Sequence, residues 1–385
     1  MVWSKSHRCC VGVTLKFVAL ACIASAAACR GLVGVPSSTD APAPARRSEP
    51  PAIPLARWPI KTASHVDLWL HAFAMLSEDT VTVPTFRLGY RDSLTVVKNR
   101  ANVLTLLDTS RPVLAKRLRA APGYLQAQTL AFAFDSWDAL RVAAERFVLA
   151  DGDSRRVLDR APVDHMVQFS RLFPTAPDRE WLRVFVAGVQ DEQSRFFGVE
   201  HARVVRTRSA TITAVDSLWQ KVYRVRFERF MTNTGQRSGD VILSTPLGGD
   251  GRAARGPERQ PVLAVPFPGR ASDANEVILV LAHEITRTLT SAVVAGVPIG
   301  AERRTTIAGG YVLLPQVRAG AMLLERVAPE LLQPYMRFYL RQSGVAMSQS
   351  LLGAPAAEAF ERVFNIPASL RDGLRQQVDL AVRAN

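Results

Sequence analysis

The chain has 385 residues, enough for one large domain or two ordinary ones, and its 48% hydrophobic and 21% charged residues are typical of a globular protein. Its formal net charge is +14, but the arginines are spread along the chain among aspartates and glutamates. Because no recognised nucleic-acid-binding module accompanies this charge, we predict no nucleic-acid partner. The two interpretations that stay open are a solvated basic surface and attraction to an anionic envelope surface.

All four cysteines lie near the N-terminus, at Cys9, Cys10, Cys22 and Cys29, and the rest of the sequence has none. The body of the protein therefore has neither a disulfide framework nor a thiolate metal site. Any metal bound there must be held by histidine and carboxylate side chains.

Residues 1–28 have the pattern of an export signal, with a basic start and a short apolar run. The run after Lys16 is shorter than the roughly 20 residues that span a bilayer, so we predict a cleaved signal peptide. Three small residues directly before Cys29 resemble a bacterial lipobox, although Ala26 stands where leucine is usual. This resemblance implies lipidation of Cys29 and a membrane-anchored lipoprotein on the periplasmic side of the cell envelope. Ordinary cleavage followed by secretion is the alternative.

Residues 29–57 are rich in proline, alanine and serine and show neither helical nor strand periodicity. Such a segment buries too little apolar surface to offset the entropy lost on ordering. We therefore predict a semi-extended linker between the membrane and the folded body.

The body from Trp58 onward is predicted to be mainly helical, because apolar residues recur at helical spacing. Trp69, Trp137, Trp181 and Trp219 occupy such apolar positions and are predicted core residues. No fixed-period repeat is present, so we predict a helical array and not a solenoid. The predicted helices before residue 232 cover 65–77, 84–107, 110–120, 122–133, 136–150, 156–172, 178–204 and 210–231. His65, His165 and His201 have polar neighbours in the sequence and are predicted to be exposed.

Two predicted strands, at 239–246 and 261–267, interrupt the helices and flank a glycine-rich turn region. Together they suggest a small hairpin or meander. A long apolar helix follows at 275–296, with Asp273 as its expected N-cap. Further helices are predicted at 308–327, 328–343, 355–364 and 368–383. The predicted fold class is therefore mainly α, with a helical array and a small β-hairpin or meander before a buried central helix.

The predicted elements change from helices to strands after about residue 232, and this change suggests a domain boundary. We predict a helical region at 58–232 and a second region at 233–385, either as two domains or as one continuous domain.

The predicted helix 275–296 carries polar residues at its centre. His283 and Arg287 are four residues apart and share a face, with Thr286 near it, whereas Glu284 lies about 100° round the helix. The residues before His283 are apolar on every side, which indicates a buried element. Buried polar groups need partners, so these residues should form a structured polar cluster.

The segment LVLAHEITRTL, which follows a strand and a glycine-rich turn, resembles the active-site helix of the zincin metallopeptidases. The resemblance covers about residues 239–330. In that family two histidines on one helical face bind zinc, and the glutamate between them activates the zinc-bound water. The resemblance implies His283 as the first zinc ligand and Glu284 as the general base. Arg287 stands where the second histidine should be, and a guanidinium does not coordinate a metal.

Two more side chains are candidate zinc ligands. Glu325 has the position of the glutamate that serves as third ligand in one branch of the zincins, although it can also pair with Arg287 or Arg326. His71 lies in an apolar helix with Asp67 four residues before it. A satisfied core or interface histidine is the alternative for His71.

Three functional hypotheses follow. The first is an exported, lipid-anchored envelope protein with a degenerate zincin-like domain, which needs no cofactor and acts in structure or in binding an envelope partner. In it Arg287 pairs with Glu284 or another carboxylate, and His283 donates to a backbone carbonyl. The second is an active zinc-dependent peptidase with unusual ligands. The third is a helical interaction protein in which the His-Glu pair is accidental. We favour the first.

Overall fold

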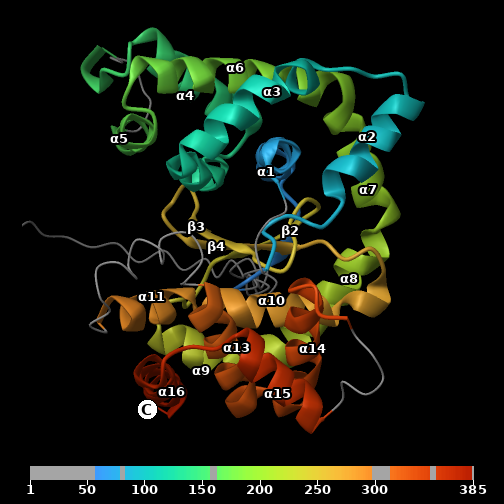
Figure 1. Cartoon of the computed structure of the whole chain (residues 1–385), viewed down its shortest axis with the longest axis vertical. Helices are drawn as coiled ribbons and strands as arrows, with labels where there is room; N and C mark the ends of the chain where they lie inside the picture. The colour runs from blue at the N-terminus through green and yellow to red at the C-terminus, as the bar shows by residue number, and fades with distance from the viewer. Residues whose placement is uncertain (1–56, 79–82, 157–162, 297–312, 347–352, 384–385) are drawn as a thin grey trace, which may run out of the picture. The chain divides into compact units, whose positions relative to one another are not determined.

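The computed structural model describes residues 57–78, 83–156, 163–296, 313–346 and 353–383. The predicted signal peptide, Cys29 and nearly all of the linker lie outside these residues. From Pro54 onward the chain forms one compact unit. This unit is mainly helical and contains one small sheet (Figure 1), which confirms the predicted fold class.

The sheet has the strand order β1-β2-β4-β3 in the described part of the chain. β1 and β4 lie on either side of β2 and are parallel to it, and β3 is antiparallel to β4. The two predicted strands are β2 and β4, so they are parallel neighbours, and the hairpin partner of β4 is a strand within the predicted turn region. Strand propensity marks a segment as extended but does not specify its partner. The strands are β1 (Ile60–Lys61), β2 (Asp240–Ser244), β3 (Arg252–Arg255) and β4 (Pro261–Pro266).

The sheet separates two hydrophobic cores. Along β2, Val241 and Leu243 belong to one core and Ile242 to the other, as the two-residue period of a strand requires. β4 alternates in the same way, because Leu263 and Val262 point to opposite cores. β1, close to the start of the described chain, pairs with β2 of the later region. The predicted regions 58–232 and 233–385 therefore share one sheet.

The first core is built by helices on one side of the sheet (Figure 1). Trp69, Trp137 and Trp181 are buried in it, as predicted. These helices are α1 (Ser64–Leu76), α2 (Tyr90–Arg100), α3 (Leu106–Ala120), α4 (Trp137–Leu149), α5 (Val163–Leu172) and α6 (Ala176–Glu192), with a 3-10 helix at Pro122–Ala133. The predicted helix 84–107 is shorter in the structure, because Thr105 caps the start of α3 with a reciprocal capping box to Asp108.

The second core lies on the opposite face of the sheet and includes the fully buried Trp219. α7 (Gly198–Thr207) continues α6 through a π-helical turn at Gln193–Phe197, and α9 (Arg224–Asn233) continues α8 (Ser209–Leu218) through another at Trp219–Tyr223. The remaining helices of this core are α10 (Asn275–Ile285), α11 (Arg287–Gly296), α13 (Leu313–Val327), α14 (Leu332–Gln342), α15 (Ala354–Val363) and α16 (Ala368–Arg383).

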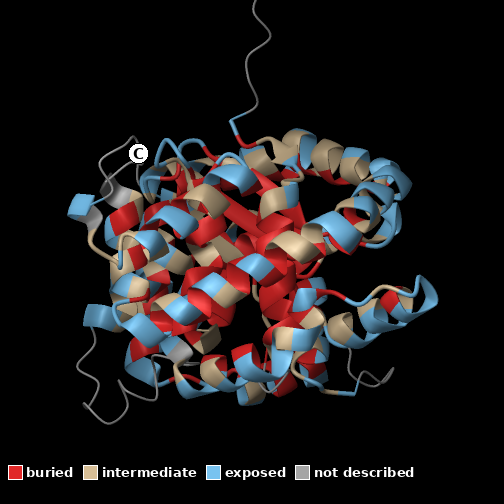
Figure 2. Cartoon of the chain, turned by 90° about the horizontal axis from the view of Figure 1, so that it is seen from above, coloured by how far each residue is buried: buried red, intermediate tan, exposed pale blue. Residues whose placement is uncertain are grey.

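The predicted helix 275–296 is α10 and α11, which meet at Thr286. Every residue of α10 from Val277 to Ile285 is buried, and the red interior of Figure 2 shows such core residues. The segment Ala271–Gly296 is long and apolar enough to cross a membrane, but 67% of its most apolar window is buried inside the protein, which is typical of a core helix. Asp273 is not the predicted cap, because its carboxylate accepts from Arg270 and α10 starts without a side-chain cap.

Candidate functional site

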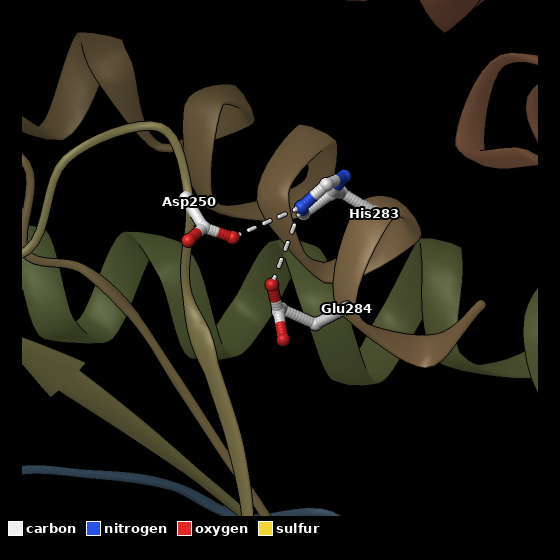
Figure 3. Close-up of side chains that lie close together, drawn as sticks. All are labelled: Asp250, His283 and Glu284. Carbon is white, nitrogen blue, oxygen red and sulfur yellow. Dashed lines mark hydrogen bonds and ion pairs between the residues drawn. The ribbon is translucent and has the colours of Figure 1, made fainter. Parts of the chain in front are cut away.

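The buried end of α10 and the glycine-rich loop 247–251 bring three possible metal ligands together. Asp250, His283 and Glu284 each offer an atom within 4.8 Å of the others. Figure 3 shows one nitrogen of the His283 ring directed at both carboxylates, and this Nε2 atom lies 3.4 Å from Asp250 Oδ1 and 3.5 Å from Glu284 Oε1. His283 and Glu284 are almost completely buried. The cluster thus joins a core helix to a loop that follows the sheet strand β2.

Arg287 completes this cluster from the first residue of α11. Its Nε donates to Glu284 Oε2 at 3.0 Å and its Nη2 to Glu284 Oε1 at 2.9 Å. The same Nη2 donates to Asp250 Oδ1 at 3.2 Å. Burial lowers the pKa of Arg287, but the charges of Glu284 and Asp250 raise it by more, so the net shift is upward. The guanidinium is therefore a fixed cation between the two carboxylates.

A second arginine neutralises the other side of Asp250. Arg252, at the start of β3, donates from Nη1 to Asp250 Oδ2 at 2.7 Å and from Nη2 to Thr85 Oγ1 at 2.7 Å. Burial raises the pKa of Asp250, but Arg252, the hydrogen bond from His283 and Arg287 lower it by more, so the carboxyl stays ionised far below its usual pKa. The cluster balances two carboxylates with two guanidinium groups.

Neighbouring polar groups fix the helix and the loop. Gln316, on α13, donates from Nε2 to the His283 carbonyl at 3.0 Å, and Thr286 Oγ1 donates to the same carbonyl at 2.8 Å. Tyr339, on α14, donates to the Gly249 carbonyl at 3.1 Å, and its ring packs against the His283 ring with centroids 5.3 Å apart. The predicted pairing of Thr286 with the polar cluster is thus made through the backbone of His283.

Glycine at position 251 lets the loop approach α10 closely. A Cβ atom there would lie 2.7 Å from the Ala264 carbonyl oxygen and 2.9 Å from Glu284 Cγ. Both distances are shorter than real Cβ contacts, so a side chain would push the loop away from the helix. The glycine-rich sequence therefore serves to place Asp250 within reach of His283 and Arg287.

These residues do not fit a zinc ion in the arrangement that the structure has. Both carboxylates accept hydrogen bonds from arginine, and the Arg287 guanidinium adds positive charge where a cation would sit. His283 Nε2 faces two carboxylates, which suits a protonated nitrogen that donates, whereas a metal needs a free lone pair. In zinc sites the other ring nitrogen normally donates to an orienting partner. His283 Nδ1 has no such partner among the described residues.

The other predicted ligands lie in different surroundings. His71 Nε2 is 3.0 Å from Glu192 Oε1 and its Nδ1 is 3.0 Å from the Tyr90 hydroxyl, in the core on the α1 side of the sheet. Glu325 is an exposed residue of α13 and pairs with Arg375 at 3.6 Å, not with Arg287 or Arg326. Neither belongs to the group formed by Asp250, His283 and Glu284. The structure does not bring His71 or Glu325 to His283.

The prediction that His201 is exposed is wrong. Its side chain is buried, and its Nε2 lies 3.3 Å from Asp67 Oδ2. That oxygen accepts hydrogen bonds from the backbone and hydroxyl of Thr245. The polar sequence around His201 reflects the exposed face of α7, whereas the histidine itself points to α1. Asp67 and His71 are four residues apart on α1. Asp67 pairs with His201 on α7, whereas His71 pairs with Glu192 at the end of α6.

Sequence reasoning did not identify Asp250, Arg252 or Gln316 as members of the site. Asp250 lies among glycines whose pattern predicts only a tight turn. Arg252 and Gln316 lie in a strand and a helix that meet the site only through tertiary packing.

No protein-family model, no curated protein and no solved structure matches this chain.

Proposed function

We propose that this chain is an exported, lipid-anchored envelope protein whose zincin-like centre is non-catalytic and serves in structure or binding. The observation that carries the proposal is the contact of the Arg287 guanidinium with both Asp250 and Glu284. A permanent cation at that position uses the carboxylate oxygens that a metal ion or an attacking water would need.

The hydrogen bonds of Glu284 support the non-catalytic role. Both of its oxygens accept from Arg287, and Gln316 Nε2 lies 3.4 Å from Oε1. A general base must have an acceptor atom within hydrogen-bond reach of the proton that it removes. In this arrangement Glu284 instead neutralises the partly buried Arg287. The cluster thereby holds the loop 247–251 against α10 and fixes the end of the sheet on the central helix.

A metal-dependent hydrolase is the second candidate function, and one observation favours it. Asp250, His283 and Glu284 already offer three donor atoms within 4.8 Å. The Arg287 side chain is 31% exposed, so it has a route to solvent. A cation that displaced it would find two carboxylates and an imidazole.

Zinc content and proteolysis separate the two candidates. The purified mature protein is incubated with zinc chloride, desalted, and measured for bound zinc and for hydrolysis of casein. The proposal expects neither stoichiometric zinc nor hydrolysis. One zinc per chain, together with hydrolysis that Glu284→Gln abolishes, would establish the second candidate instead.

The membrane anchor is tested separately, because it depends on the sequence before Cys29. Wild-type protein expressed in a bacterial host should incorporate labelled palmitate and enter the detergent phase of Triton X-114. Cys29→Ser should lose both properties and appear in the aqueous phase. An unlabelled wild-type chain in the aqueous phase would support secretion without a lipid.

A further inference from the structure

A cavity of about 1140 Å³ lies beside β3, between that strand and the helices α4 and α5. Its wall along the sheet is formed by β3 and the turn after it, and the opposite wall by α4, α5 and the end of the 3-10 helix Pro122–Ala133. Asp250, His283 and Glu284 are not among its lining residues. The cavity is therefore separate from the polar cluster, and it is large enough for a ligand of several residues.

β3 is an edge strand, since β4 is its neighbour on one side and no described strand pairs with the other. Gly256 N donates to the Gln260 carbonyl, and hydrogen-bonded pairs alternate along an antiparallel ladder. Arg255 and Ala253 therefore occupy the positions whose backbone groups point away from β4. Both residues line the cavity. An edge of this kind can accept another strand.

The charges around the cavity favour an acidic ligand. Asp138 already has a partner, because Arg141 Nη2 lies 3.5 Å from its Oδ1. Arg171, on α5, is exposed and forms no ion pair or hydrogen bond with the described residues. The arginines of the lining outnumber its aspartates, and they are Arg146, Arg171, Arg255 and Arg259 against Asp135 and Asp138.

Apolar side chains complete the lining. Val167, on α5, is 57% exposed, and Phe134 and Val142 line the same wall, which faces β3. In an extended peptide successive side chains point to opposite sides. Apolar residues of such a peptide can therefore face Val167 and Val142, while alternate residues reach the arginines. A lipid or a polysaccharide has no backbone amide to pair with β3.

We propose that this groove binds an extended peptide segment with acidic residues, which adds to the free edge of β3 as a further strand. Four residues of β3 span roughly 13 Å, so a comparable length of peptide pairs with it. Its backbone bonds to Ala253 and Arg255, and its carboxylates meet Arg171 and the Arg255 side chain. The inference goes beyond the proposed function, because it holds whether the cluster at His283 is inert or binds a metal.

The probe is a fluorescein-labelled peptide of alternating glutamate and valine, and binding to the full mature chain is measured by fluorescence anisotropy. Two matched probes test separately whether binding depends on the acidic side chains and on the backbone N–H groups of the peptide. One has lysine in place of glutamate, and the other keeps the acidic sequence but carries N-methyl groups on alternate backbone nitrogens. We expect the acidic probe to bind at least about tenfold more tightly than either. Hydrogen exchange at Ala253 and Arg255 should slow when it binds.

The variant Arg171→Glu/Arg255→Glu should weaken the acidic probe by about tenfold or more. Arg111→Glu/Arg206→Glu makes the same change in net charge at exposed helix positions outside the groove and should leave binding within about twofold. Circular dichroism verifies that both variants fold. Equal binding of the acidic and N-methylated probes, or equal loss in both variants, would overturn the proposal. So would binding of phosphatidylglycerol vesicles to the wild type but not to Arg171→Glu/Arg255→Glu, together with no binding of the acidic probe to the wild type, since a membrane surface would then be the ligand.

Discussion

The Arg287 guanidinium is bidentate on the Glu284 carboxylate, with Nε 3.0 Å from Oε2 and Nη2 2.9 Å from Oε1. Parallel bonds of this kind are strong and orient both groups. Because Nη2 also donates to Asp250, one side chain connects α11, α10 and the loop 247–251. The cluster depends on this cation, since Asp250 and Glu284 would otherwise face each other across His283 with only Arg252 to balance them.

Arg287→Ala should destabilise the fold. A buried ion pair that loses one partner costs roughly 3–5 kcal/mol, and partial exposure of the Arg287 side chain reduces the expected loss to about 2–3 kcal/mol. Urea unfolding followed by tryptophan fluorescence measures this change. Arg341→Ala is the matched control, because Arg341 pairs with Glu276 at 2.6 Å on the surface and should contribute less than about 1 kcal/mol. An equal decrease in the free energy of unfolding in the two variants would show that the Arg287 cluster stabilises the fold no more than an exposed ion pair does.

Arg287→His tests the resemblance to the zincins directly. It removes the cation and places an imidazole four residues after His283, on the same helical face. We expect this variant to bind one zinc ion per chain, measured by mass spectrometry of the metal content, with Asp250 close enough to contribute an oxygen. Arg287→Gln also removes the charge but adds no imidazole, so it should bind far less zinc. If both variants bind zinc equally, the helix does not have zincin geometry.

The sequence was sufficient for many of the helices and for the strands β2 and β4, but not for the pairing of the strands. Apolar spacing located α1, α4 and α16 closely, because each buries one face against a core. β3 was missed because its residues Arg-Ala-Ala-Arg have low strand propensity, and it is held as a strand by its pairing with β4. The parallel pairing of β2 and β4 also depends on this intervening strand.

The candidate site was predictable in its helical half alone. His283, Glu284 and Arg287 are close in sequence, and helical geometry brings them together without knowledge of the fold. Asp250 reaches them only because the loop after β2 returns over α10, and no local pattern encodes that path. His71 is the opposite case. Its partner Glu192 lies 121 residues later in the sequence, and this contact holds His71 away from the site at His283.

Gly251→Ala should disturb the loop that carries Asp250. The new methyl group would overlap the Ala264 carbonyl and Glu284 Cγ, so the loop must shift, at a cost of about 1–3 kcal/mol. Thermal unfolding measures the change. Gly269→Ala is the control, because a Cβ atom at that position has no neighbour within 4 Å. It should alter stability by less than about 0.5 kcal/mol. An unchanged Gly251→Ala protein would mean that the loop is not held tightly against α10.

Glu192 forms buried contacts with Lys98 and His71, and these contacts should make the stability of the fold decrease at acid pH. Lys98 Nζ donates to Glu192 Oε2 at 2.8 Å, and His71 Nε2 contacts Oε1 at 3.0 Å. Burial raises the pKa of Glu192, but the hydrogen bond from His71 and the charges of His71 and Lys98 lower it by more, to about 2. An unfolded glutamate has a pKa near 4.3, so the folded state binds a proton less readily than the unfolded state.

Glu192→Gln should therefore lose most stability at neutral pH and little at low pH. The wild-type Glu192 carboxylate makes its full contribution to the free energy of unfolding above about pH 5, and this contribution disappears as the pH falls through 4.3 toward 2. The two pKa values correspond to on the order of 3 kcal/mol at pH 7. The measurement is urea unfolding of wild type and variant at pH 7, 5, 4 and 3, and the difference in the free energy of unfolding should shrink steadily as the pH falls.

Lys98 keeps its contact with Asp108 at 2.6 Å, which leaves the Lys98 charge paired in the variant. Glu145→Gln, which removes an exposed partner of Arg141, should show a small difference that does not follow this course. A Glu192→Gln loss that stays constant from pH 7 to pH 3 would mean that Glu192 stabilises the fold by packing and not through its charge.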